Sequence, residues 1–171
     1  MRKIPKLLLV VPCYNEEEVL PVASGIFREE LSSLVARGIV SSDSGILFVD
    51  DGSKDRTWDI VSELASSSSV CAGIRQSRNR GHQNALWAGL MEARRIGCDI
   101  TVTIDCDGQD DIKAIESMVA QYMKGAEIVY GVRNDRSSDA FFKRFTAECF
   151  YRLQALMGIE AVYNHADYRL L

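Results

Sequence analysis

Residues 7–18 read LLLVVPCYNEEE, a run of five apolar residues that breaks abruptly into a proline and a group of polar residues. Four similar apolar runs follow along the chain, and longer segments with apolar residues at helical spacing lie between them. This alternation predicts an α/β fold with a mainly parallel central sheet and helices on both faces. The expected strands are Leu7–Val11, Gly45–Val49, Val70–Gln76, Asp99–Ile104 and Glu127–Gly131, and the expected helices are Glu17–Ala36, Asp55–Ala65, Gly81–Ile96 and Asp111–Met123.

Length and composition limit the domain count and the class of partner. The chain has 171 residues, 47% of them hydrophobic, so residues 1–171 are expected to form a single domain around one core. The net charge of -4 provides no basic field, so no nucleic-acid partner is expected. Five cysteines without CxxC spacing argue against a disulfide framework and a zinc site, which favours a reducing, cytoplasmic setting.

Membrane contact can only be peripheral within this sequence, because no apolar stretch approaches the roughly 18 residues that a spanning helix needs. The segment from about Asp139 to Met157 places apolar residues near one helical face. It is interpreted as a core-packing helix, with a helix lying on a membrane surface as the alternative. The sequence stops at Leu171 without a turn or cap signal, so we expect a strand there and a domain truncated at its C-terminus.

Two aspartates follow the fourth expected strand. Asp105 and Asp107 stand two residues apart at its end, where both carboxylates can point at one cation. Magnesium is commonly held by one or two carboxylates together with substrate phosphates. A site with only two protein carboxylates therefore suits a cation that binds together with a nucleotide diphosphate. The alternative is a solvated turn, since such loops are often rich in aspartate.

Two further segments follow strand ends. Asp50 or Asp51 could accept hydrogen bonds from a base or ribose, or both could cap the next helix, for which Ser53 and Asp55 are other candidate caps. The segment 77–84, SRNRGHQN, brings guanidinium groups, Arg78 among them, to a helix N-terminus, and both features favour phosphate. Its histidine, His82, is interpreted as structural in preference to a catalytic base.

Together these segments resemble the inverting glycosyltransferases with a glycosyltransferase A-type, Rossmann-like fold, in particular dolichyl-phosphate mannose synthases and bacterial polyprenyl-phosphate glucosyltransferases. The resemblance runs nearly end to end and rests on an ordered set of motifs. These are VVPCYNEEE, FVDDGSKDRT, SRNRGHQNALWAGL, TIDCDGQDD, YGVRNDR and NHADYRLL.

The resemblance implies a role for each matching position. Asp105 and Asp107 would be the DxD pair, with Mg²⁺ or Mn²⁺ chiefly on Asp107 and Gln109 beside it. The nucleotide pocket would be lined by Pro12, Tyr14, Glu16 and Asp51, with Asp51 directed at the base. Phosphates or acceptor would be approached by Arg133 and Arg144, and the segment Asp167-Tyr168-Arg169 would lie near the acceptor.

The chain also departs from the family pattern. Gly108 replaces the usual leucine of the DxD segment, and Asp111 stands where proline is expected, although the metal pair is intact. Asn164 replaces an aspartate found in many relatives, so no catalytic role is carried over to it. Lipid-linked relatives continue into membrane helices that this sequence does not contain.

The predicted activity is a metal-dependent, inverting transfer of a sugar from a nucleotide-diphosphate sugar, a UDP-sugar in first place, to a polyprenyl phosphate. A growing polysaccharide as acceptor and a non-catalytic nucleotide-sugar-binding module are the alternatives. For a hydroxyl acceptor Asp167 is the candidate general base. A dehydrogenase and a P-loop hydrolase are disfavoured because neither GxGxxG nor GxxxxGK occurs. We expect the full-length protein to lie at the inner face of the cell membrane. The sequence leaves open whether it forms a homo-oligomer.

Overall fold

The computed structural model describes residues 2–132 and 165–171, and it describes side chains for residues 2–131 and 168–171. A six-stranded sheet in the order β3-β2-β1-β4-β6-β5 forms its centre. The strands are β1 (Leu7–Cys13), β2 (Gly45–Asp50), β3 (Cys71–Arg75), β4 (Ile100–Thr103), β5 (Val129–Val132) and β6 (His165–Leu170). The helices are α1 (Leu20–Ala36), α2 (Thr57–Ser67), α3 (His82–Arg95) and α4 (Ala114–Met123).

The central strand is β1, which pairs in parallel with β2 on one side and with β4 on the other. The β2 strand pairs in parallel with β3, so the carboxyl ends of four strands reach the same edge of the sheet. Only β6 runs the other way among the described strands, because it is antiparallel to both of its neighbours, β4 and β5. The predicted mainly parallel α/β fold is therefore confirmed.

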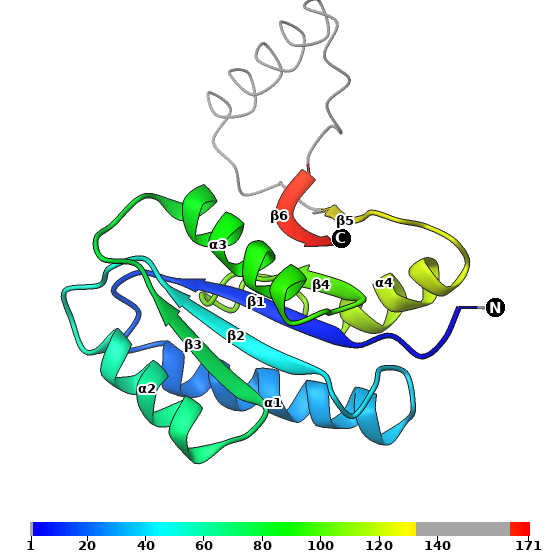
Figure 1. Ribbon diagram of the computed structural model, residues 1–171, viewed down its shortest axis with the longest axis horizontal. Coiled ribbons are helices and arrows are strands. Elements are labelled where there is room, and N and C mark those ends of the chain that lie inside the picture. The colour runs from blue at the N-terminus through cyan, green and yellow to red at the C-terminus, as the bar shows by residue number, and fades with distance from the viewer. Residues whose placement is uncertain (1, 133–164) are drawn as a thin grey trace, which may run out of the picture.

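Alternating side chains of the strands supply two cores. Leu7, Leu9 and Val11 of β1 belong to the larger core, which α1, α2 and α4 cover. The intervening residues Leu8 and Val10 belong to a smaller core under α3. Figure 1 shows α3 on one side of the sheet and α1 and α2 on the other. Coverage of both faces explains why β1 and β2 consist almost entirely of apolar residues.

All four helices begin later than the sequence predicts, by one residue for α3 and by two or three residues for the others. At α2 and α4 an acidic residue that was expected inside the helix forms a turn before it. Asp55 accepts hydrogen bonds from the Thr57 amide and hydroxyl at 3.0 and 2.6 Å, just before α2. Asp111 accepts one from the Lys113 amide at 3.0 Å, just before α4. The expected segment 139–157 lies outside the described residues. Among those that are described, no helix is long and apolar enough to span a bilayer.

Helix α3 lies close to the sheet through Gly89. A Cβ atom on Gly89 would lie 2.3 Å from Cγ1 of Val10 and 3.2 Å from Cγ2 of Val49. We expect Gly89→Ala to lower the free energy of unfolding by about 1–3 kcal/mol through overpacking. The matched control is Gly25→Ala in α1, where nothing lies within 4 Å and alanine should stabilise by about 0.5–1 kcal/mol. Urea unfolding of both variants checks the pair, and equal effects would contradict the close approach.

Candidate nucleotide and metal site

A cavity of about 300 Å³ lies where the loops after β1, β2 and β4 meet. In open α/β sheets ligands bind at this edge, beyond the carboxyl ends of the strands. Its lining includes residues from the start of α3 as well. The described residues that line it are Pro12, Cys13, Tyr14, Glu16, Asp51, Asn79, Gly81, His82, Ala85, Asp105, Cys106 and Asp107.

The turn after β2 is organised by Asp50, whose side chain is fully buried. Its Oδ1 accepts the Ser53 amide at 3.0 Å, and its Oδ2 lies 3.0 Å from Nε of Arg75. The same guanidinium donates to the Ser53 carbonyl at 3.2 Å and lies over the Trp58 ring. Asp50 therefore shapes the turn, whereas its neighbour Asp51 lines the cavity.

Asp51 joins the turn after β2 to the loop before α3. Its Oδ1 accepts the Arg80 amide and its Oδ2 accepts the Gly81 amide, both at 2.8 Å. The loop also packs on Gly52, where φ is +70° and a Cβ atom would lie 2.4 Å from the carbonyl carbon of Arg78. Only glycine fits there. The interpretation that both aspartates cap the next helix is wrong, because neither side chain binds an amide of α2, and Asp51 instead binds two amides of the loop before α3.

The loop after β1 is tied to the same turn. The Asn15 amide donates to Oγ of Ser53 at 3.0 Å, and the Asn15 Oδ1 accepts the Lys54 amide at 3.0 Å. The next amide, of Glu16, donates to Oγ1 of Thr57 at 2.7 Å. Asn15 adopts a positive φ of 56°, which asparagine tolerates better than most residues. These bonds hold Tyr14 and Glu16 at the mouth of the cavity.

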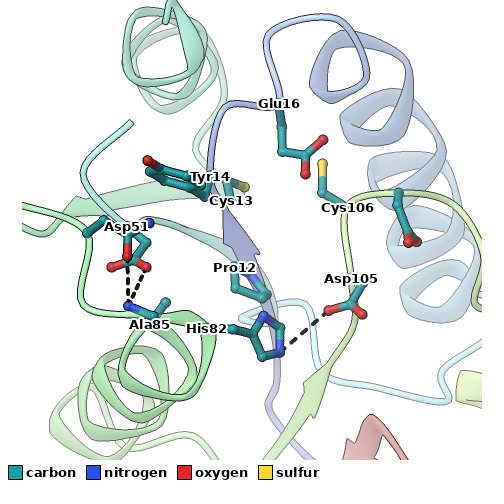
Figure 2. Close-up of a pocket in the computed structure, with 12 residues that line it drawn as sticks. Pro12, Cys13, Tyr14, Glu16, Asp51, His82, Ala85, Asp105 and Cys106 are labelled. Carbon is teal, nitrogen blue, oxygen red and sulfur yellow. Dashed lines mark hydrogen bonds and ion pairs between the residues drawn. The ribbon is translucent and has the colours of Figure 1, made fainter. Parts of the chain in front are cut away.

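The acidic pair follows β4 directly, as predicted. Oδ1 of Asp105 lies 3.8 Å from Nε2 of His82, the first residue of α3. Asp107 is exposed, and its Oδ1 accepts the Gln109 amide at 2.9 Å across the turn that Gly108 makes at φ +72°. Figure 2 shows His82 and Asp105 on one side of the cavity, with Tyr14 and Asp51 on the other.

Negative charge gathers in this cavity without a lysine or arginine among its described lining residues. Burial raises the pKa of Glu16, and the charges of Asp107, Asp55 and Asp105 raise it further. No group of three or more ligating side chains exists among the described residues. A cation whose shell is completed by phosphate oxygens needs only one or two carboxylates, so Asp105 and Asp107 fit Mg²⁺ or Mn²⁺ bound together with a nucleotide diphosphate.

The raised pKa of Glu16 gives a testable pH dependence. The folded chain holds this proton more tightly than the unfolded chain does, so ionising Glu16 costs stability as the pH rises through its folded pKa. We expect Glu16→Gln to raise the melting temperature at neutral pH without metal, with the gain shrinking in acid. Glu18→Gln, at an exposed neighbouring position, is the matched control. If the rise in melting temperature does not depend on pH, or if Glu18→Gln shows the same rise, then ionised Glu16 does not destabilise the fold.

A hydrogen bond from β6 stabilises the loop that carries Asp105 and Asp107. The buried Tyr168 hydroxyl donates to the Asp111 carbonyl at 2.9 Å. Burial, helped by the charges of Asp110 and Asp111, raises the pKa of this hydroxyl far above its usual range, so it remains a donor. Tyr168 thus adds a bond that links the last strand to the loop after β4.

The predicted site residues fall into three groups. Six of them line the cavity, namely Pro12, Tyr14, Glu16, Asp51, Asp105 and Asp107. Arg78 and Gln109 belong to adjoining loops, where Arg78 packs its backbone on Gly52 and Gln109 donates its amide to Asp107. Arg133, Arg144 and the side chain of Asp167 lie outside the described residues.

Sequence reasoning passed over other lining residues, including Cys13, Cys106 and Asn79. The motifs could have indicated the two cysteines, because Cys13 directly precedes Tyr14 and Cys106 lies between Asp105 and Asp107 in the sequence. His82 was interpreted as structural, and it does lie against Asp105. Because it also lines the cavity, it is within reach of a bound ligand.

Comparison with known proteins agrees with the resemblance. The model of the family described as glycosyl transferase family 2 matches residues 8–170. The uncharacterized glycosyltransferase YkoT of Bacillus subtilis (strain 168) is 47% identical over 167 residues, covering 98% of this chain and 49% of YkoT. The prophage bactoprenol glucosyl transferase homolog of Escherichia coli (strain K12) is 37% identical over 167 residues, covering 97% of this chain and 52% of that protein.

The chain therefore spans about half the length of the curated relatives it matches. Among solved structures, glucosyl-3-phosphoglycerate synthase from Mycobacterium tuberculosis in complex with Mn²⁺, UDP and glucosyl-3-phosphoglycerate superposes with a TM-score of 0.57 at 20% identity. That match covers 97% of this chain and 56% of the synthase, and it supports the predicted glycosyltransferase A-type fold. From the family match along nearly its whole length and its identity to these relatives, the chain belongs to glycosyl transferase family 2.

Proposed function

We propose that the chain transfers a sugar from a nucleotide-diphosphate sugar to a polyprenyl phosphate, in a metal-dependent reaction that inverts the anomeric carbon. The observation that carries the proposal is the convergence of Glu16, Asp105 and Asp107 with Tyr14 and Asp51 on one cavity. Carboxylates for a cation and groups suited to a nucleotide thus share one site at the carboxyl edge of the sheet.

The nucleotide would lie toward Tyr14 and Asp51. The Tyr14 ring is 38% exposed and offers an aromatic face to a base. Each oxygen of the Asp51 carboxylate already accepts one backbone amide, and an ionised carboxylate can accept about four hydrogen bonds in all. Capacity for a base or ribose donor therefore remains. A uridine nucleotide is favoured because the synthase from Mycobacterium tuberculosis holds UDP together with Mn²⁺.

The diphosphate would lie toward Asp105 and Asp107, which would hold Mg²⁺ or Mn²⁺ with Asp107 as the chief ligand. When bound, such a cation stabilises the negative charge that develops on the leaving diphosphate. His82 and the N-terminus of α3 lie at the same cavity and favour an anionic group there. Arg78, Arg133 and Arg144 are proposed to act on the phosphates or the acceptor, with Gln109 supporting Asp107.

The proposed acceptor, a polyprenyl phosphate, is supported by the name of one relative and by the ionisation of a phosphate monoester. The relative from Escherichia coli is named as a bactoprenol glucosyl transferase homolog. A phosphate monoester has a second pKa of about 6, so it is largely ionised at neutral pH and attacks without a general base. A hydroxyl acceptor would need one, and Asp167 is the candidate. A polyprenyl phosphate resides in a bilayer, so we propose that the full-length protein works at the inner face of the cell membrane.

The experiment supplies labelled UDP-glucose and Mg²⁺ with either polyprenyl phosphate in detergent or a soluble glycan, and follows label into each acceptor. We expect transfer to the lipid phosphate, blocked by a chelator, with the anomeric configuration of the product opposite to that of the donor by NMR. Transfer to the glycan alone would overturn the acceptor, and retained configuration would overturn the mechanism. Donor binding without turnover in any arm would favour a binding module.

A further inference from the structure

The outer face of α3 exposes two large apolar side chains. The residues that this helix turns toward the sheet are buried, namely Ala85, Leu86, Gly89 and Ala93. On the opposite side of the helix lie Trp87, which is 63% exposed, and Met91, which follows one turn later and is 43% exposed. Among the described helices α3 alone covers this side of the sheet, so its outer face is a surface of the protein there.

The same face carries positive charge. Arg94 and Arg95 follow in the last turn of α3, and both are exposed. Residues 64–98 contain five arginines and one acidic residue, Glu92, whose Oε1 lies 2.6 Å from Nη2 of Arg95. The net charge of the whole chain is -4. Positive charge is therefore concentrated in and around α3, next to the exposed tryptophan and methionine.

Helix α1 also exposes apolar side chains, but the charges beside them are negative. Val22 is 67% exposed and Ile26 is 48% exposed. Glu29 follows Ile26 by three residues, Glu18 precedes Val22 by four, and both glutamates are exposed. Figure 1 shows α1 and α3 on opposite sides of the sheet. A negatively charged surface would therefore attract the face of α3 and repel that of α1.

We propose that the outer face of α3, formed by Trp87, Met91, Arg94 and Arg95, docks on the surface of an anionic lipid bilayer. A tryptophan ring is favoured at the level of the lipid headgroups, and the methionine adds apolar contact beside it. The arginines lay their aliphatic stems along the apolar region and direct their guanidinium groups to lipid phosphates. The contact is peripheral and reversible, since no part of α3 enters the hydrocarbon core.

Docking through this face would bring the cavity close to the bilayer. The first residue of α3, His82, lines the cavity, so the docked helix leads from the membrane surface to the proposed donor site. A polyprenyl phosphate presents its phosphate at the level of the headgroups. The proposed acceptor would thus meet the donor beside the N-terminus of α3. This consequence rests on the proposed function, whereas binding of the chain to anionic lipid does not.

The first test mixes the chain with vesicles of phosphatidylcholine alone, or of equal parts phosphatidylcholine and phosphatidylglycerol, and measures the bound fraction by flotation. We expect binding to the anionic vesicles, weakened by salt. It should fall about tenfold in Trp87→Ala and about fivefold in Arg94→Gln. The matched controls on α1, Val22→Ala and Arg28→Gln, change exposed residues and should bind like the parent chain. No binding by the parent chain, or equal losses in the controls, would overturn the proposal.

Fluorescence identifies what covers Trp87. The chain has two tryptophans, so a Trp58→Phe variant reports on Trp87 alone. Its emission should shift to shorter wavelength when anionic vesicles are added. A short-wavelength emission that is already present without lipid and is lost on dilution would assign the face to a second copy of the chain. The same emission at every concentration would assign it to another segment of the same chain. Either outcome would overturn docking on lipid.

Sugar transfer tests the consequence for the acceptor. With polyprenyl phosphate in anionic vesicles, Trp87→Ala should raise the KM for this acceptor about tenfold and leave kcat unchanged, because the weaker docking lowers the amount of chain at the membrane. In detergent the variant should match the parent chain. An unchanged KM in vesicles would overturn the role of α3 in reaching the acceptor. If the parent chain transfers no sugar in either arm, the proposed function fails, and vesicle binding still decides the docking surface.

Discussion

Asp107→Asn is expected to remove the metal-dependent part of nucleotide binding and to lower sugar transfer by about a hundredfold or more. Asp107 is exposed, lines the cavity and follows β4 two residues after Asp105. The asparagine keeps the side-chain shape and one acceptor oxygen for the Gln109 amide, so the turn should persist while the charge is lost. Calorimetric titration of UDP with Mg²⁺ and with a chelator measures the metal-dependent part directly.

The control for this change is Asp43→Asn, which removes a charge from an exposed loop far from the cavity in sequence. It should leave both binding and transfer unaltered. The account requires that Asp107→Asn and the parent chain melt at similar temperatures without ligand. Equal UDP affinity of the variant and the parent in Mg²⁺ would show that the carboxylate does not hold the cation.

Asp51→Asn is expected to lower the free energy of unfolding by about 1 kcal/mol, because it removes one acceptor from a pair of partly buried hydrogen bonds. Asp51 is 3% exposed, and its two oxygens accept the Arg80 and Gly81 amides. An asparagine offers one acceptor and points an NH₂ group at the second amide. The loop before α3 should therefore shift, and UDP binding should weaken together with stability.

Asp59→Asn, at an exposed position in the first turn of α2, serves as the control for the loss of one charge. Urea unfolding and UDP titration of the two variants separate the two roles of Asp51. A loss of stability with normal UDP affinity would mean that Asp51 serves only the loop. A loss of affinity with unchanged stability would contradict the importance of the two amide bonds.

The parallel part of the sheet could be predicted because its signal is local. Each strand from β1 to β4 lies in a short, mainly apolar run bounded by Gly, Asp, Ser or Asn, and β1 and β2 have both of their faces buried. The position of β6 could not be predicted in the same way. A strand was expected near Leu171, but its insertion between β4 and β5 depends on pairings such as Val102 with Leu170, which no sequence period encodes.

The candidate site likewise contains residues that a local sequence signal predicts and contacts that depend on distant parts of the chain. Residues at strand ends, such as Glu16, Asp51 and Asp107, could be found because the carboxyl edge of a parallel sheet gathers them. The partners of Asp51 could not, since its bonds to Arg80 and Gly81 join loops about 30 residues apart.

The central claim is that one cavity binds the nucleotide diphosphate and its cation through the residues after β1, β2 and β4. Crystals of the chain grown with UDP and Mn²⁺, measured for anomalous scattering by manganese, test it most directly. We predict one manganese peak against Asp107 and the diphosphate, with the base between Tyr14 and Asp51. A peak instead in the neighbouring acidic groove of Glu17, Glu18 and Asp55, or a nucleotide bound elsewhere, would contradict the account.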